Sequence, residues 1–302
     1  MPATEKNLST SGFELIVGDS DLTAWVTANR RFLLDRFREH GALLFRGFTG
    51  GIDAFVAFTD LFCDAYMYNT IPSSRVRLDI SRRHKIQTVD LGGAFFPLHA
   101  ERAQSPFQAD IAFFHCRQAP NAGGETTFCD GSLLLSKLPA NIREYLSSKT
   151  FRYLTYSPAE ELMNFLDVTD PNQLPRTLEE RALDQVFFMN DGRFVMNYIV
   201  PALRPSKFSK GLSFANFLLF ARYCLKRDDF PTSAVGVKIP QSTCDEIHEI
   251  ARRLTTSVEW RNDDFLMLDN TRVMHGRNPV SPDSHREIWS RFGYVRPEWI
   301  EA

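Results

Sequence analysis

Apolar residues recur at helical spacing in the first clear element of the chain. Across residues 21–41 they fall every three or four positions, which predicts one amphipathic helix with Gly41 at its C-terminal cap. The residues of this apolar face are Leu22, Val26, Leu33 and Phe37. The following stretch, GALLFRGF, is apolar and β-favouring and predicts a buried strand, after which a second helix is expected from Ala54 to Tyr66.

The residue pattern changes from helical periodicity to short extended runs at Lys85. The runs KIQTVD, QADIAFFHC and ETTFC are short and β-favouring, and Gly, Pro and Asn separate them. Helices are expected over 132–148 and 245–256, and strands over 257–261, 263–269 and 286–295. Because early and late strands must lie together, this order predicts an α+β protein, one domain over residues 1–302, built on a closed double sheet.

Composition narrows the class of function. The 302 residues are 43% hydrophobic and carry a net charge of −2, with both signs of charge spread along the chain. Such a chain can fill a large core but offers no general surface for nucleic acid or acidic lipid. Its first residues resemble no secretory signal, and no apolar run has the length of a membrane span. We therefore expect a cytoplasmic protein that acts on a small molecule, and its five cysteines are expected to be free thiols.

Three residues form a candidate metal site. In FFPLHAERAQ, His99 and Glu101 are two apart, so in an extended segment both side chains project from one face. A second imidazole comes from His275, which follows a predicted strand and the turn-forming pair Asp269-Asn270. Two imidazoles and one carboxylate define the facial triad of non-haem iron, which leaves coordination positions open for a bidentate ligand and O₂.

The downstream residues suggest what the bidentate ligand is. Arg286 lies eleven residues after His275, at the head of a predicted strand, and its planar guanidinium matches a carboxylate with two parallel hydrogen bonds. Arg291 lies five further along and therefore on the opposite face of that strand. The glycines of PNAGGETTFCDG allow a tight turn or a close backbone approach, after which Thr126 or Thr127 presents a hydroxyl to the same carboxylate. A five-carbon diacid fits this arrangement.

Three stretches together carry a resemblance to a known family. They are GALLFRGF, then LHAE followed by FFHCRQAPNAGGETT, and the pattern W-x₃-D-x₄-DN-x-R-x₂-H-x-R from Trp260 to Arg277. The chain resembles the taurine dioxygenase and clavaminate synthase-like family of 2-oxoglutarate-dependent oxygenases. The resemblance implies a double-stranded β-helix, or jelly-roll, core with flanking helices, and a helical insertion or lid over roughly 158–238.

The resemblance also implies roles for individual residues. His99, Glu101 and His275 match the ligands of Fe(II), and Thr126 and Arg286 match the residues that bind 2-oxoglutarate, which is consumed with O₂. Glu101 stands where many members have Asp, and a carboxylate at this position argues against a halogenase. The implied reaction is hydroxylation, with desaturation or cyclisation as variants.

The substrate is the least defined part of this prediction. Its candidate contacts are Arg75 in the basic stretch SSRVRLDISRRHK, then Arg102, Asn197 and Arg291. They suit a small amino-acid-like or specialised metabolite, and an anionic or carrier-protein-tethered substrate stays open, as does a homo-oligomer. Two alternatives remain from other classes, a non-catalytic jelly-roll binding protein and a zinc hydrolase on a cupin-like barrel.

Overall fold

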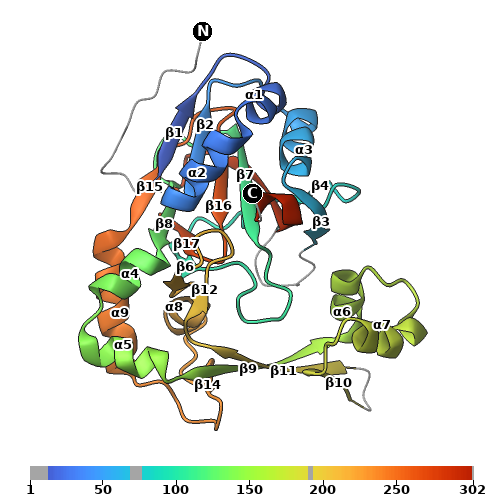
Figure 1. The fold of residues 1–302 in the computed structure, drawn as a ribbon, viewed down its shortest axis with the longest axis vertical. Helices are drawn as coiled ribbons and strands as arrows, with labels where there is room; N and C mark the ends of the chain where they lie inside the picture. The colour runs from blue at the N-terminus through green and yellow to red at the C-terminus, as the bar shows by residue number, and fades with distance from the viewer. Residues whose placement is uncertain (1–12, 69–76, 190–192, 301–302) are drawn as a thin grey trace.

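Two β-sheets lie at the centre of the computed structural model, which describes residues 13–68, 77–189 and 193–300 (Figure 1). The larger sheet has the order β1 (Glu14–Val17), β2 (Ala42–Arg46), β16 (Phe265–Asp269), β7 (Ile111–Gln118), β18 (Glu287–Val295), β5 (Ile86–Thr88) and β4 (Asp79–Ser81), and β3 (Cys63–Met67) also pairs with β18. The smaller sheet has the order β15 (Thr256–Val258), β8 (Thr126–Asp130), β17 (Val273–Arg277) and β6 (Phe96–His99). Early and late strands alternate in both sheets, as the prediction of an α+β protein requires.

Side chains of the large sheet alternate between two cores. On β16, Phe265 and Met267 join an aromatic cluster beneath the N-terminal helices, whereas Leu266 and Leu268 point to the other side. That other side meets the small sheet, because the cluster containing Leu266 also includes Phe128 of β8. The central strands are therefore buried on both faces and read as continuous apolar runs.

Helices α1 (Leu22–Ala28), α2 (Arg30–His40) and α3 (Ile52–Asp60) cover the outer face of the large sheet (Figure 1). The single helix predicted over 21–41 is interrupted at Asn29, whose side-chain amide donates to the carbonyl oxygen of Trp25. This local hydrogen bond competes with the continuation of the helix. The helix predicted from Ala54 to Tyr66 ends at Asp60, since the following residues pair as β3 with β18. Gly41 forms the expected left-handed cap.

Helices α4 (Gly131–Lys137), α5 (Ala140–Ser147), α8 (Leu218–Tyr223) and α9 (Gln241–Leu254) cover the small sheet from its other side. Their apolar faces meet Leu98 of β6 in one buried cluster. None of the helices in the described part of the chain is long and apolar enough to span a membrane.

The middle of the chain departs from the helical insertion that was expected over 158–238. It contains α6 (Ala159–Leu166), α7 (Leu174–Glu180) and short strands β12 (Arg204–Pro205) and β13 (Leu212–Ser213), but also a separate antiparallel sheet. The strands of this sheet are β10 (Val186–Phe188), β11 (Arg193–Pro201), β9 (Thr150–Pro158) and β14 (Thr232–Ser233). Its outer face carries exposed apolar residues such as Tyr156 and Ile199, so the strands lack the apolar–polar alternation by which a sequence reveals them.

Candidate metal and cofactor site

The two predicted imidazole ligands come from neighbouring strands of the small sheet. His99 is the last residue of β6, and it lies directly opposite His275 of β17, with the ring centroids 4.6 Å apart. The Nδ1–H of His99 donates to the carbonyl oxygen of Pro97 at 3.1 Å, which turns Nε2 toward the cavity. The ring of Phe114 packs edge-on against His275 from the facing sheet. Strand pairing therefore sets the separation of the two rings.

Glu101 reaches the site in a different way from the one expected. It lies beyond the end of β6, in a turn, and not two residues along an extended strand. The side chain of Asn270 holds that turn, since its Oδ1 accepts from the Glu101 backbone N–H at 2.7 Å and its Nδ2 donates to the Glu101 carbonyl oxygen at 3.0 Å. A further hydrogen bond from Nδ2 to the carbonyl oxygen of Ala109 fixes the Asn270 amide itself. Asn270 is a positioning residue, whereas the sequence pattern gave it only a place in a turn.

The three side chains fit a metal ion. Their candidate ligand atoms all lie within 4.8 Å of one another, and all three residues are buried. The Nδ1 atom of His275 is buried and finds no hydrogen-bond partner in the described part of the chain. Burial lowers the pKa of His275 to about 3, so the imidazole stays neutral, as a ligand must. Although burial opposes it, the pKa of Glu101 lies far below its usual range, because His99 and Arg77 stabilise the carboxylate. A neutral imidazole pair and an ionised carboxylate are the donor set of a facial triad.

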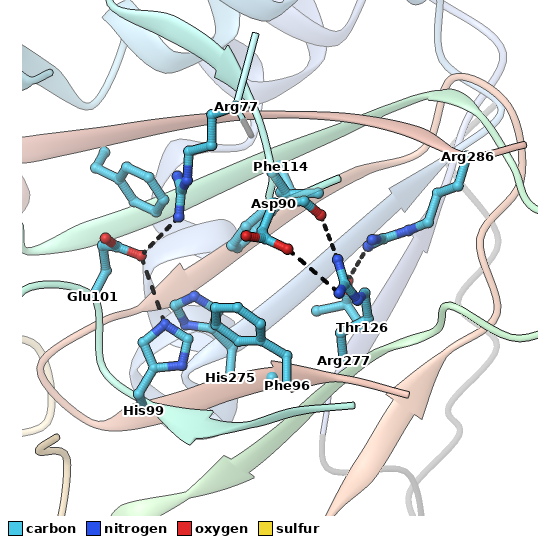
Figure 2. Close-up of a pocket in the computed structure, with 13 residues that line it drawn as sticks. Arg77, Asp90, Phe96, His99, Glu101, Phe114, Thr126, His275, Arg277 and Arg286 are labelled. Carbon is cyan, nitrogen blue, oxygen red and sulfur yellow. Dashed lines mark hydrogen bonds and ion pairs between the residues drawn. The ribbon is translucent and has the colours of Figure 1, made fainter. Parts of the chain in front are cut away.

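A narrow inner cavity leads from this triad to Thr126 and Arg286, between the two sheets (Figure 2). The Thr126 hydroxyl oxygen accepts from Nε1 of Trp260 at 3.0 Å and from Nη2 of Arg286 at 3.3 Å. With both lone pairs engaged, its proton is left for an acceptor in the cavity. Nε of Arg286 is buried, and no residue that the structure describes accepts a hydrogen bond from it. The predicted pair of cofactor residues therefore meets at one end of the cavity and presents donors for an anion.

The predicted glycine turn makes room for Arg286. Gly123 and Gly124 both have positive φ, at 70° and 72°, which side-chain-bearing residues rarely adopt. A Cβ atom on Gly124 would lie 3.1 Å from Cδ of Arg286. The close backbone approach expected from the paired glycines is thus one between the backbone of Gly124 and the aliphatic part of the Arg286 side chain.

Arg277 adds a second buried positive charge that sequence reasoning overlooked, although it closes the H-x-R motif. Its Nη2 donates to the carbonyl oxygen of Ala94 at 3.0 Å and lies 3.6 Å from the carboxylate of Asp90. Burial and the nearby charge of Arg277 lower the pKa of Arg286 to about 9. Two guanidinium groups facing one cavity favour an anionic occupant.

A second, outer cavity of about 310 Å³ opens on the other side of the triad. The two cavities share His99, Glu101 and Arg77 at their junction. Arg102, predicted to contact substrate, lines the outer cavity, where its guanidinium lies 3.6 Å from Glu161 and 4.2 Å from the ring centroid of Phe165. Contact between Arg102 and the substrate stays a prediction.

Two of the other candidate substrate contacts point away from the cavity. Arg291 lies on the face of β18 that meets the helices, where it pairs with Asp60 at 2.7 Å. It therefore faces away from Arg286, as the alternation of side chains along a strand predicted, and it does not reach the cavity in which a substrate contact was expected. Asn197 alternates with the cavity-lining Met196 and accepts from Arg152 at 2.6 Å on the opposite face of β11. Arg75 lies outside the described residues.

Comparisons with known proteins agree with this geometry. The model of the family described as taurine catabolism dioxygenase TauD, TfdA family, matches residues 6–291. A clavaminate synthase-like protein of Arabidopsis thaliana is 23% identical over 282 residues, which are 86% of this chain and 84% of the relative.

Two solved structures share the fold. A taurine dioxygenase of Burkholderia xenovorans superposes with a TM-score of 0.63 at 16% identity, covering 98% of this chain and 90% of its own. PvcB of Pseudomonas aeruginosa superposes with a TM-score of 0.58 at 14% identity, covering 97% and 90%. PvcB is described as an Fe, α-ketoglutarate dependent oxygenase from an isonitrile synthetic pathway. With a family match across nearly the whole sequence, the chain belongs to the TauD, TfdA family and is a 2-oxoglutarate-dependent non-haem iron dioxygenase.

Proposed function

We propose that His99, Glu101 and His275 hold the Fe(II) of this dioxygenase, and that Thr126 and Arg286 bind the distal carboxylate of 2-oxoglutarate in the inner cavity. The observation that carries the proposal is the convergence of the three ligand atoms within 4.8 Å at the junction of two cavities, one of which ends at a buried arginine. A bidentate guanidinium and a donating hydroxyl suit a carboxylate, and the second positive charge, on Arg277, strengthens the field.

The residues of the chain divide the work around this site. When bound, iron with 2-oxoglutarate and O₂ supplies oxidative chemistry in which the diacid becomes succinate and CO₂ and a substrate C–H bond is oxidised. Thr126 and Arg286 orient the diacid from one side, and the aromatic rings of the outer cavity exclude water and position the substrate from the other. Asn270 keeps the backbone of Glu101 in place.

The finer architecture is part of the same proposal. We infer that the two facing sheets form a double-stranded β-helix, or jelly roll, within a single domain, and that the segment 158–238 covers the substrate cavity as a lid. In support, α6 and β11 supply Glu161, Phe165, Phe194 and Met196 to the outer cavity. Hydroxylation of a small amino-acid-like or specialised metabolite is the proposed reaction, and the isonitrile pathway of PvcB is in keeping with a specialised metabolite.

Succinate formation from 2-oxoglutarate tests the proposal. The purified protein is incubated with 2-oxoglutarate and a panel of candidate metabolites, with and without Fe(II) and O₂. We expect succinate only when both are present, and more of it when the substrate is included. Metal binding without turnover across the panel would favour a binding protein, and turnover that persists without O₂ would favour a hydrolase.

A further inference from the structure

Arg77 stands at the junction of the two cavities, where it lines both (Figure 2). Its Nη2 lies 3.8 Å from Oε2 of Glu101, a distance suited to an ion pair but too long for a hydrogen bond. Its Nη1 is buried and has no hydrogen-bond partner among residues 13–68, 77–189 and 193–300. The side chain as a whole is 19% exposed. Arg77 therefore brings a poorly satisfied guanidinium to the edge of the metal site.

The charge on Arg77 becomes harder to accommodate once the site is loaded. The carboxylate that faces it belongs to Glu101, which in the proposed function is a ligand of the metal. A carboxylate that binds a cation has less negative charge to share with a second cation. A half-buried guanidinium would then face the metal without a full counter-charge, which is unfavourable away from bulk water. An anion entering the outer cavity would remove this penalty.

The walls of the outer cavity indicate which kind of chemical group is attached to that anion. They are lined by aromatic side chains from well-separated parts of the chain, namely Phe96, Phe107, Phe165, Phe194, Phe217, Phe220 and Phe230. Aromatic rings bury large apolar areas and favour edge-to-face or offset contacts with another ring. Two further polar atoms in the lining, Oε1 of Gln104 and Oγ1 of Thr155, are buried and have no hydrogen-bond partner within the described part of the chain. The cavity thus offers a cation at one end, apolar walls, and isolated hydrogen-bonding groups.

The sign and number of charges favour a monoanion. The other two arginines that line the outer cavity are already matched, since Arg102 faces Glu161 at 3.6 Å and Arg227 pairs with Asp229 at 2.9 Å. Besides Glu101, the carboxylate of Asp90 lines both cavities, and its buried Oδ2 atom has no hydrogen-bond partner among the described residues. A dianionic phosphate would be repelled by these two carboxylates, whereas a carboxylate needs a single guanidinium. A substrate tethered to a carrier protein through a thioester would have no carboxylate left for Arg77. A free carboxylic acid fits the charges best.

We propose that Arg77 binds the carboxylate of the primary substrate, and that this substrate is a free arylalkyl carboxylic acid whose aromatic body lies among the phenylalanines of the outer cavity. The proposal rests on the proposed metal site and deepens it, because it assigns the substrate class and the residue that recognises it. Arg77 thereby takes the role that the sequence suggested for Arg291, which points to the opposite face of its strand.

Binding to an inert form of the enzyme tests this assignment without turnover. The protein is loaded with Mn(II) and N-oxalylglycine, and calorimetry measures the affinity for phenylacetate, 3-phenylpropanoate and N-acetylphenylalanine, each compared with its neutral amide. We expect the carboxylates to bind at least about tenfold more tightly than the amides, as is typical of a buried charge pair. Arg77→Gln should remove this preference and leave the affinity for the amides within about twofold.

Matched variants separate the contribution of Arg77 from general effects of charge and folding. Arg83→Gln removes an exposed positive charge from the same basic stretch and should leave the preference intact. Arg77→Lys keeps the charge without the two-pronged geometry, so an intermediate loss is expected, and it serves if Arg77→Gln does not fold. Failure of the wild-type protein to bind Mn(II) or N-oxalylglycine would count against the proposed function itself. Normal loading with no preference for carboxylates, or a preference that survives in Arg77→Gln, would overturn the assignment of Arg77.

Discussion

The inner and outer cavities meet at one cluster of side chains but are formed by different structural elements and lined by different types of residue. The inner cavity lies between the two central sheets, and Thr126, His275 and Arg286 reach it from strands or from the residue just before a strand. The outer cavity is enclosed by loops, by α6 and α8, and by the separate sheet of β9 and β11. The first is a narrow slot lined by three arginines, Arg77, Arg277 and Arg286, and the second is a wider cavity lined mainly by phenylalanine.

This difference separates groups that are held rigidly from groups whose arrangement can change. Groups on paired strands are fixed by backbone hydrogen bonds on both sides, so they can hold a small diacid to within a fraction of an ångström. Groups on loops and on an added sheet can change shape with little cost to the central core. We therefore expect changes in the inner cavity to affect the cofactor and the metal, and changes in the outer cavity to affect the substrate.

Removal of a metal ligand should have the largest effect. His275→Ala deletes one of the three groups that hold the metal, and we expect succinate formation to fall by on the order of 10³-fold or more, beyond the 10–100-fold typical of outer-shell partners. Succinate is measured at saturating 2-oxoglutarate and Fe(II). His248→Ala is the matched control, because His248 stacks on Tyr223 on the surface of α9, away from both cavities. Retained turnover in His275→Ala would rule out the triad.

Arg286, just before β18, and Arg291, in the middle of that strand, provide the next comparison. Arg286→Gln leaves a carboxylate in the inner cavity without its guanidinium, and we expect the KM for 2-oxoglutarate to rise by on the order of 10²-fold, as is typical for a buried charge pair. Steady-state succinate formation over a range of 2-oxoglutarate concentrations gives this value.

Arg291→Gln is the control for that experiment and carries its own expectation. Arg291 binds Asp60 and the hydroxyl of Thr59 on the helix side of the strand, so its loss should lower the free energy of unfolding by about 2 kcal/mol. The KM for 2-oxoglutarate should stay unchanged, and urea denaturation measures the stability. If the two variants raise this KM equally, the opposite faces of β18 do not have the separate roles assigned to them.

Loss of the amide that supports Glu101 should have a smaller effect. Asn270→Ala removes three hydrogen bonds, two of them to the backbone of Glu101, and we expect the affinity for Mn(II) to fall roughly tenfold because such supporting partners orient the ligand. Metal titration followed by electron paramagnetic resonance measures this affinity. Asn278→Ala, which removes a hydrogen bond to Glu125, is the control. Equal metal affinity in the two variants would show that Asn270 supports only the fold.

The sequence predicted the elements of the inner cavity well because each has a local signature. Positive φ at Gly123 and Gly124, and the alternation that separates Arg286 from Arg291, both follow from short-range geometry. Even there, the structure corrected one step, since Glu101 reaches the site from a turn and depends on Asn270, 169 residues away. Long-range support of this kind leaves no periodic pattern in the neighbourhood of the residue that it supports.

The outer cavity was largely beyond prediction for the same reason. Its walls come from segments far apart in the chain, and a phenylalanine in a cavity looks in sequence like one in a core. Asn197 was expected to reach the substrate. It directly follows the cavity-lining Met196 on β11, and because successive side chains of a strand point to opposite faces, Asn197 points away from the cavity. Without knowledge of the strand register, the two residues were indistinguishable.

A change confined to the outer cavity should have the smallest effect and should test whether the two cavities are separable. Phe165 stacks on Phe107 with the ring centroids 5.1 Å apart, and the guanidinium of Arg102 lies 4.2 Å from the centroid of the Phe165 ring. Phe165→Ala removes this aromatic wall, and we expect 3-phenylpropanoate to bind the form loaded with Mn(II) about three- to tenfold more weakly, the loss typical of one aromatic contact. The dissociation constant of N-oxalylglycine, measured by calorimetry on the same preparation, should change by less than about twofold, since no strand of the inner cavity is altered.

Phe165→Leu retains part of the apolar surface and should show a smaller loss. Equal weakening of both ligands would mean that the outer wall also shapes the inner slot, and the division between a cofactor cavity and a substrate cavity would have to be abandoned.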